Sequence, residues 1–125
     1  LPSYQKRFFP LDDEPRLSSC ALLGIGENGH IAFHEPEIPN NFNYGCVSLS
    51  ETTRDSLKLS KDSYGLSYGL GTFLKVPHIL LLASGAKKAP IVKSLLNSNS
   101  AEYVVSHLKN HSDITLILHS NMISI

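Results

Sequence analysis

The sequence predicts an α/β domain in which a mainly parallel sheet is flanked by helices. Three short aliphatic runs, at residues 20–24, 79–83 and 114–118, have the length and composition of buried strands. Segments with helical signals separate them along the chain, and this alternation is typical of parallel strands, which need a crossover connection. We therefore expect these three strands to be buried neighbours in one parallel sheet.

The first 19 residues contain three prolines among mixed charges and predict irregular structure, with one short helix near residues 4–9. Because the chain begins with Leu1 rather than Met and starts so loosely, we expect upstream sequence to be missing. After the first strand comes a loop at residues 24–39. Its prolines, Pro36 and Pro39, exclude a long helix there.

The middle of the chain predicts a second strand, a helix and an extended stretch. Residues 46–49 alternate between apolar and polar side chains, as a strand does. Ser50 is a favourable N-cap for a helix over residues 51–59. The glycine-rich residues 64–71 are expected to be extended, and residues 72–74 to open a short helical turn.

Two helices are expected before the last strand. The first covers residues 87–96 and would place Ile91, Leu95 and Leu96 on one face. The second covers residues 103–109. No internal repeat, low-complexity tract or interdomain linker is visible, so residues 20–125 are treated as one unit and residues 1–19 as an irregular N-terminal segment.

Composition excludes several functional classes. Lys plus Arg and Asp plus Glu number 11 each in 125 residues, so the basic excess of a nucleic-acid binder is absent. The longest uncharged apolar run, residues 76–85, is too short to span a bilayer. Cys20 and Cys46 lie in strand-like segments and are expected to be buried free thiols in a reducing compartment. A cytoplasmic protein without nucleic-acid or membrane partners is expected.

Gly24, Gly26 and Gly29 follow the first strand in the spacing of a dinucleotide-binding loop. That interpretation requires a long helix beginning at Gly29, and Pro36 lies only seven residues further on. We therefore regard nucleotide binding as the weaker interpretation. The glycines Gly26 and Gly29 remain candidates for a close approach of the backbone to a substrate.

His30, His34 and Glu35 lie within this same loop. A histidine beside a carboxylate is a common proton-transfer pair, because the acid orients the ring and stabilises its charged form. Two alternatives are a structural histidine bonded to backbone and a metal site built on the i, i+4 histidines. Zinc would need a third ligand and a continuous helix, which Pro36 disfavours, so no metal is expected.

Residues 23–36 resemble the signature of the glucosamine-6-phosphate deaminase/isomerase family, which in outline reads leucine-glycine-x-glycine-x-(Asp/Asn)-glycine-histidine-x-x-x-x-glutamate-proline. The resemblance continues at residues 66–72, 79–82 and 85–88, and then at residues 116–121, which look more like the galactosamine-6-phosphate branch; it covers about residues 20–125. It implies the C-terminal half of a Rossmann-like three-layer fold, here present in part.

The resemblance also implies roles for individual side chains. The histidine matching His30 helps to open the sugar ring, and the glutamate matching Glu35 is its partner. The lysine matching Lys88 binds the substrate phosphate, and Arg54 or Lys58 is expected to be the second cation. Ring opening requires a proton at the ring oxygen, and isomerisation requires a proton to move from C2 to C1. A lysine suits a phosphate because it is a charged hydrogen-bond donor.

The sequence departs from the family pattern at three places. Asn28 stands where the glucosamine enzymes usually carry Asp, which favours the galactosamine branch and leaves an amide to orient the imidazole. His34 stands where the family usually has Asn. The family's N-terminal half supplies a phosphate-binding Gly-Thr-Pro loop and an aspartate that moves the C2 proton, and residues 1–19 contain neither.

The leading hypothesis is therefore an amino-sugar-6-phosphate deaminase/isomerase that releases ketose 6-phosphate and ammonia, with this chain alone expected to be inactive. No cofactor is expected, the ligand is a small sugar phosphate, and a homo-oligomer is allowed. One alternative is a 6-phosphogluconolactonase, whose loop also ends in Gly-His; Glu35 favours the deaminase. The other is a non-catalytic sugar-phosphate-binding domain.

Overall fold

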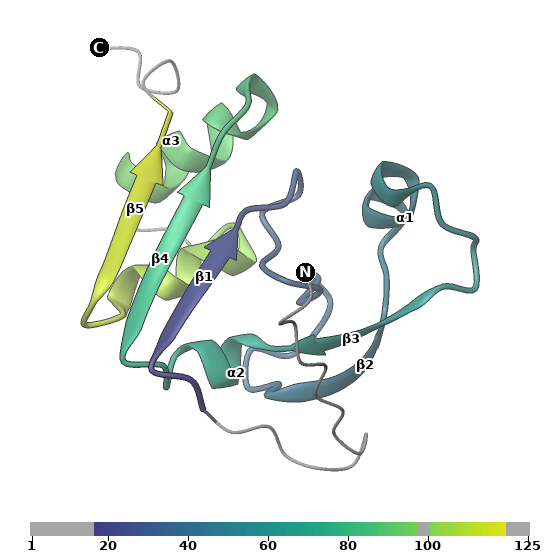
Figure 1. Ribbon diagram of the computed structural model, residues 1–125. Helices are drawn as coiled ribbons and strands as arrows, with labels where there is room; N and C mark the ends of the chain where they lie inside the picture. Colours follow the sequence, from purple (N-terminus) through teal and green to yellow (C-terminus); the bar gives the residue numbers. More distant parts are fainter. Residues whose placement is uncertain (1–16, 98–100, 120–125) are drawn as a thin grey trace, which may run out of the picture.

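The computed structural model describes residues 17–97 and 101–119. Its larger sheet has three strands in the order β1-β4-β5, namely β1 (Cys20–Gly24), β4 (His78–Ala83) and β5 (Ile114–Leu118). Both pairings are parallel, with Leu22 opposite Leu80 and Leu81 opposite Leu116. Figure 1 shows the three arrows pointing the same way. The predicted parallel sheet is confirmed, whereas the short helix expected near residues 4–9 lies outside the described residues.

Helices cover one face of this sheet. In Figure 1, α3 (Ala89–Asn97) and η2 (Val104–Asn110) lie behind it. The core between the sheet and these helices contains apolar side chains from both layers, including Ile79 and Leu81 of β4, Ile91 of α3 and Val105 of η2. Burial of these side chains is the main stabilising contribution to this layer pair.

The opposite face of the sheet differs from the expectation of fully buried strands. Leu22, Leu82 and Ile117 are 63%, 39% and 44% exposed, respectively. Successive strand residues point to opposite faces, so burial alternates along β1 instead of being continuous. In the described part of the chain, the aliphatic runs therefore bury one face and present the other to solvent.

The helices near the C-terminus also differ in detail from their predictions. A 3-10 turn, η1 (Ala86–Lys88), precedes α3, so the α-helix itself begins at Ala89. Val92 is buried with Ile91 and Leu95, whereas Leu96 is 51% exposed. A helical turn takes 3.6 residues, which carries Leu96 round to the outer side. The expected helix at 103–109 is the 3-10 helix η2.

Within residues 17–97 and 101–119, no helix is long and apolar enough to cross a membrane.

A second, two-stranded antiparallel sheet pairs β2 (Tyr44–Ser48) with β3 (Tyr64–Tyr68). The helix α1 (Glu51–Leu57) connects them, and Figure 1 shows this unit beside β1. Ser50 accepts a hydrogen bond from the Thr53 amide, which confirms the predicted N-cap. Lys58 has the left-handed backbone conformation and ends the helix before residue 59. The short turn near residues 72–74 is α2 (Leu70–Phe73).

Both cysteines are free, and the prediction that they are buried is wrong. Cys20 and Cys46 are exposed. Each lies in a strand, as expected, but on the outward-pointing positions of its alternating pattern. Strand residues on an uncovered face remain exposed whatever their hydrophobicity.

Candidate active site

The loop that follows β1 turns back on itself instead of forming a helix. The Gly26 amide donates to the His30 carbonyl at 2.9 Å, and the Gly29 amide donates to the Gly26 carbonyl at 3.0 Å. Gly29 has a φ of +81°, and a Cβ there would lie 2.5 Å from the ring of Tyr103. Glycine is thus required at this position on both counts. The dinucleotide interpretation needed a helix here, and the structure does not have one.

The turn places His30 beside Glu35. The distance between His30 Nδ1 and Glu35 Oε2 is 3.5 Å. Asn28 joins the pair differently from the prediction: its side-chain amide donates to Glu35 Oε2 at 3.1 Å, and its oxygen accepts from the His30 backbone amide at 3.1 Å. Asn28 therefore orients the carboxylate and the loop backbone, and the imidazole meets Glu35.

Glu35 is 1% exposed, and it accepts hydrogen bonds from Asn28, Ser50 and Thr53. Thr53 Oγ1 donates to Oε1 at 2.5 Å, and the Ser50 amide donates to the same oxygen at 3.3 Å. Burial alone would raise the pKa of this carboxyl group, but the hydrogen bonds from Thr53 and Asn28 and the proximity of His30 outweigh burial and lower its pKa. Glu35 is therefore a buried carboxylate that stays ionised at neutral pH.

Burial disfavours the charged form of His30 and therefore lowers its pKa below 6.5. The negative charge of Glu35 counteracts this effect, and the positive charge of Lys88 adds to it. The ring is therefore neutral at pH 7 and able to accept a proton. Should it do so, the carboxylate at 3.5 Å is in place to stabilise the imidazolium.

His30 and Lys88 line one cavity of about 320 Å³, together with Gly26 and Thr53. His30 follows β1, and Lys88 follows β4 at the end of η1. The carboxyl ends of adjacent parallel strands meet at one sheet edge, which is where open α/β sheets bind ligands. The predicted proximity of Lys88 to the histidine loop is thus present in the structure.

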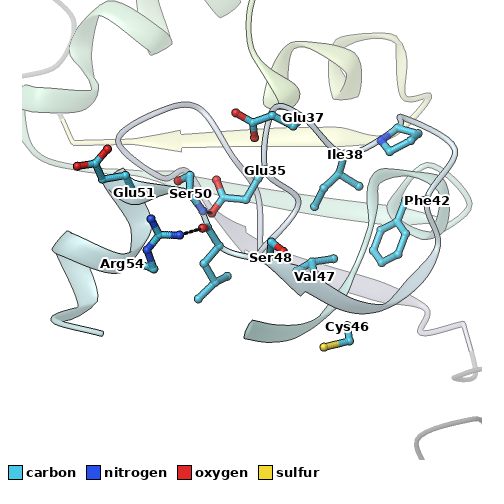
Figure 2. Close-up of a pocket in the computed structure, with 12 residues that line it drawn as sticks. Glu35, Glu37, Ile38, Phe42, Cys46, Val47, Ser48, Ser50, Glu51 and Arg54 are labelled. Carbon is cyan, nitrogen blue, oxygen red and sulfur yellow. Dashed lines mark hydrogen bonds between the residues drawn. The ribbon is translucent and has the colours of Figure 1, made fainter. Parts of the chain in front are cut away.

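Arg54 and Lys58 lie elsewhere. Arg54 lines a neighbouring cavity of about 570 Å³ with Glu35 and Glu51, and its Nη1 donates to the Leu49 carbonyl at 2.5 Å. Figure 2 shows Arg54 and Glu51 on α1, with Glu35 among the other side chains that line this second cavity. Lys58 lines neither of these two cavities. The structure therefore places Lys88 in the same cavity as His30, whereas neither of the other two candidate cations lines that cavity.

His34, for which the sequence suggested no role, is a fully buried structural residue. Its Nδ1 accepts from the Leu70 amide at 2.9 Å, so its Nε2 carries the proton and donates to the Ile38 carbonyl at 3.2 Å. The ring also packs edge-on against Phe42. Burial lowers the pKa of His34, which keeps this bridge neutral. His34 ties the loop to the start of α2.

Thr53 was missed in the sequence, although its position carried a signal. It stands three residues after the N-cap Ser50, where a helix side chain turns back toward the cap. Its hydroxyl donates a hydrogen bond to Glu35 and lies 3.4 Å from His30 Nδ1.

In the part of the chain that the structure describes, no group of three or more His, Cys, Asp or Glu side chains could hold a metal ion.

The curated proteins that the chain resembles include several glucosamine-6-phosphate deaminases. No family model matches the chain. A glucosamine-6-phosphate deaminase from Bacillus cereus (strain G9842) is 38% identical over 111 residues, which are 83% of this chain and 42% of the relative. One from Bacillus anthracis (strain A0248) is 37% identical over the same shares. The chain thus spans about 42% of the length of these curated relatives.

Solved structures show the same fold. A monomeric glucosamine-6-phosphate deaminase of the NagB superfamily superposes with a TM-score of 0.75 and 38% identity, covering 84% of this chain and 46% of that one. A 6-phosphogluconolactonase from Trypanosoma cruzi superposes with a TM-score of 0.65 and 23% identity, covering 83% and 39%. At that identity the second likeness concerns the fold alone.

Proposed function

Because the chain belongs to the glucosamine-6-phosphate deaminase family, we propose that the protein converts an amino-sugar 6-phosphate and water into a ketose 6-phosphate and ammonia. One observation carries this proposal: a buried carboxylate, Glu35, backs an imidazole, His30, that shares a cavity with the ammonium group of Lys88. A site that opens the ring of a sugar phosphate needs a proton carrier near the anomeric carbon and a cation near the phosphate.

The role proposed for His30 is to open the pyranose ring. Neutral His30 accepts the proton of the anomeric hydroxyl, a C1–O double bond forms, the bond from C1 to the ring oxygen breaks, and His30 returns the proton to that oxygen. Protons balance, and no other donor is consumed. The lowered pKa of His30 makes the first transfer available at neutral pH. The carboxylate of Glu35 stabilises the transient imidazolium.

The role proposed for Lys88 is to bind the phosphate. Lys88 is close enough for its charge to lower the pKa of His30, and both side chains line the cavity of about 320 Å³. A lysine is a point-charge donor that suits phosphate oxygens. Arg54 is already bonded to the Leu49 carbonyl in the other cavity, so we assign the phosphate to Lys88 first.

For the substrate, we propose glucosamine 6-phosphate, the compound named for the curated relatives. Galactosamine 6-phosphate, which differs at the C4 hydroxyl, is the second candidate. The neutral Asn28 and the resemblance of residues 116–121 favour it. Residues 120 and 121 of that segment lie outside the described residues.

The test is ammonia release by the complete protein from both amino-sugar 6-phosphates, with 6-phosphogluconolactone hydrolysis measured in parallel. We expect ammonia and ketose 6-phosphate in equal amounts from at least one amino sugar, and no lactone hydrolysis above the spontaneous rate. Lactone hydrolysis without ammonia release would replace the proposal by the lactonase. Binding of both sugar phosphates without turnover would replace it by the non-catalytic alternative.

A further inference from the structure

The hydroxyl of Thr53 lies where the helix α1 meets the histidine loop. Thr53 is 3% exposed, and its Oγ1 has three polar neighbours: Glu35 Oε1 at 2.5 Å, Ser50 Oγ at 3.1 Å and His30 Nδ1 at 3.4 Å. Glu35 and His30 precede it by 18 and 23 residues. The contact therefore joins two segments that only the tertiary fold brings together.

The direction of each hydrogen bond follows from counting protons. A threonine hydroxyl has one proton and two lone pairs. Glu35 is ionised and can only accept, so the Thr53 proton points to Oε1. The Ser50 hydroxyl donates to Thr53 Oγ1 at 3.1 Å, while Ser50 Oγ itself accepts from the Thr53 amide and from the Asn28 side chain. Toward His30, Thr53 Oγ1 has only a lone pair left.

The neighbouring ring nitrogen must then carry a proton. We propose that Thr53 is a positioning residue that holds neutral His30 in the Nδ1–H tautomer and leaves the Nε2 lone pair facing the cavity. Among the described residues, His30 Nε2 has no hydrogen-bond partner; the face of the ring near Nε2 lies over Gly26, and both residues line the cavity. Both oxygens near Nδ1, from Thr53 and Glu35, act as acceptors.

The tautomer decides whether His30 can act as the proposed function requires, and this catalytic consequence rests on that function. Only a bare Nε2 can accept the proton of an anomeric hydroxyl; with the other tautomer, the bare nitrogen would face the buried carboxylate. Glu35 Oε2 and Thr53 Oγ1 lie 3.5 Å and 3.4 Å from Nδ1, both at the long end of hydrogen-bond reach, so it is the two acceptors together that favour a proton on Nδ1. Thr53 adds a second acceptor and, by donating to Glu35, keeps that carboxylate in place.

The tautomer can be measured without any substrate. Long-range ¹H–¹⁵N spectra of histidine-labelled chain distinguish Nδ1–H from Nε2–H rings. The variants are Thr53→Val, which removes the hydroxyl at similar volume, and Thr53→Ser, which keeps it. The helix N-cap uses the Thr53 backbone amide and survives both changes. His34 is an internal control, because the Leu70 amide fixes it as Nε2–H independently of Thr53.

We expect Nδ1–H at His30 in the wild type and in Thr53→Ser, and a mixture with Nε2–H in Thr53→Val, with His34 unchanged in all three. An unchanged Nδ1–H signal in Thr53→Val would overturn the proposal, as would Nε2–H in the wild type. If the His34 signal shows that Thr53→Val does not fold, Thr53→Ala is measured instead, with the same expectation.

Kinetics of the complete protein then separate this inference from the proposed function. Thr53→Val should lower kcat roughly 10–100-fold, as loss of a residue that orients a catalytic histidine does, with KM nearly constant and Thr53→Ser close to wild type. A tautomer change in a protein without deaminase activity would contradict only the proposed function. Deaminase activity that Thr53→Val leaves unchanged would contradict only the role of Thr53.

Discussion

His30 Nδ1 lies 3.5 Å from Glu35 Oε2, and the two side chains differ sharply in their access to solvent: His30 is 16% exposed and Glu35 is 1% exposed. The carboxylate is enclosed by donors from Asn28, Ser50 and Thr53. A ligand in the cavity of about 320 Å³ can therefore reach the imidazole, whereas Glu35 does not line that cavity. We expect Glu35 to act on such a ligand through His30.

Replacement of His30 by Gln should slow turnover of the complete protein by roughly 10²–10⁴-fold, the usual contribution of a positioned acid–base group. The thermal unfolding midpoint should change little, because the ring is partly exposed on a loop. His78→Gln is the matched control, since His78 is exposed and pairs with Asp113 at the opposite end of β4. Wild-type turnover in His30→Gln would make His30 a structural residue.

Lys88→Met should raise KM for the sugar phosphate about tenfold or more while changing kcat less, because a phosphate contact remote from the reacting carbons contributes mainly to binding. The adjacent Lys87 provides the control: it is 80% exposed and pairs with Glu27 at 3.6 Å. Lys87→Met should leave KM near the wild-type value. Equal effects of the two substitutions in steady-state kinetics would argue against the assignment of Lys88.

Gly26→Ala should disturb the imidazole directly, because a Cβ at position 26 would overlap the His30 ring. Gly24→Ala, two residues earlier, is the control, since a Cβ there meets nothing within 4 Å. We expect kcat to fall about tenfold or more in Gly26→Ala and to stay near wild type in Gly24→Ala. The His30 signals in NMR spectra should shift only in the first variant. Unshifted His30 signals in Gly26→Ala would show that the ring is not held against Gly26.

Asn28→Asp should raise the pKa of His30, because an added negative charge favours the imidazolium. The pH below which His30 becomes protonated, and stops accepting protons, should then move upward. The variant also loses the amide that donates to Glu35 and places two carboxylates side by side, so its free energy of unfolding should decrease. An NMR titration of His30 measures the first effect; a pKa that stays constant or falls contradicts it.

Acid should weaken the fold before any carboxylate is protonated. Burial lowers the pKa values of His34 and His30 below 6.5 in the folded chain, so below that pH the unfolded chain binds more protons. The free energy of unfolding should therefore decrease as pH falls below about 6.5, by up to about 1.4 kcal/mol per pH unit for each excluded proton. Glu35, whose pKa is lowered from 4.5, adds a further loss below that value.

His34→Gln tests this origin, because glutamine does not titrate. Urea unfolding between pH 5 and 7 should show a smaller slope than in the wild type. Stability at pH 7 should also decrease by about 1–3 kcal/mol, since the Leu70 amide and the Ile38 carbonyl lose a well-placed buried partner. A pH slope equal to that of the wild type would show that His34 does not contribute to acid sensitivity.

Elements with strong local signals were predictable. The three aliphatic runs became β1, β4 and β5, since a short run of apolar residues closed by glycine or a polar residue leaves few alternatives to a sheet strand. Ser50 capped α1 because capping is decided within one helical turn. The face of each element was less predictable. Leu96 and Cys20 were expected on buried faces, but both side chains are exposed to solvent, because exposure depends on which neighbouring layer is present.

The sequence by itself determined the strands, the turn of the histidine loop and the pairing of His30 with Glu35, because these depend on residues close together in the chain. The meeting of Lys88 with His30 followed from one general rule about the ends of parallel strands. Only the tertiary structure decided that Thr53 contacts Glu35, that His34 bridges to Leu70, and that Arg54 faces a different cavity. The physical reason is that a hydrogen bond depends on positions within a few tenths of an ångström, and packing between distant segments sets those positions.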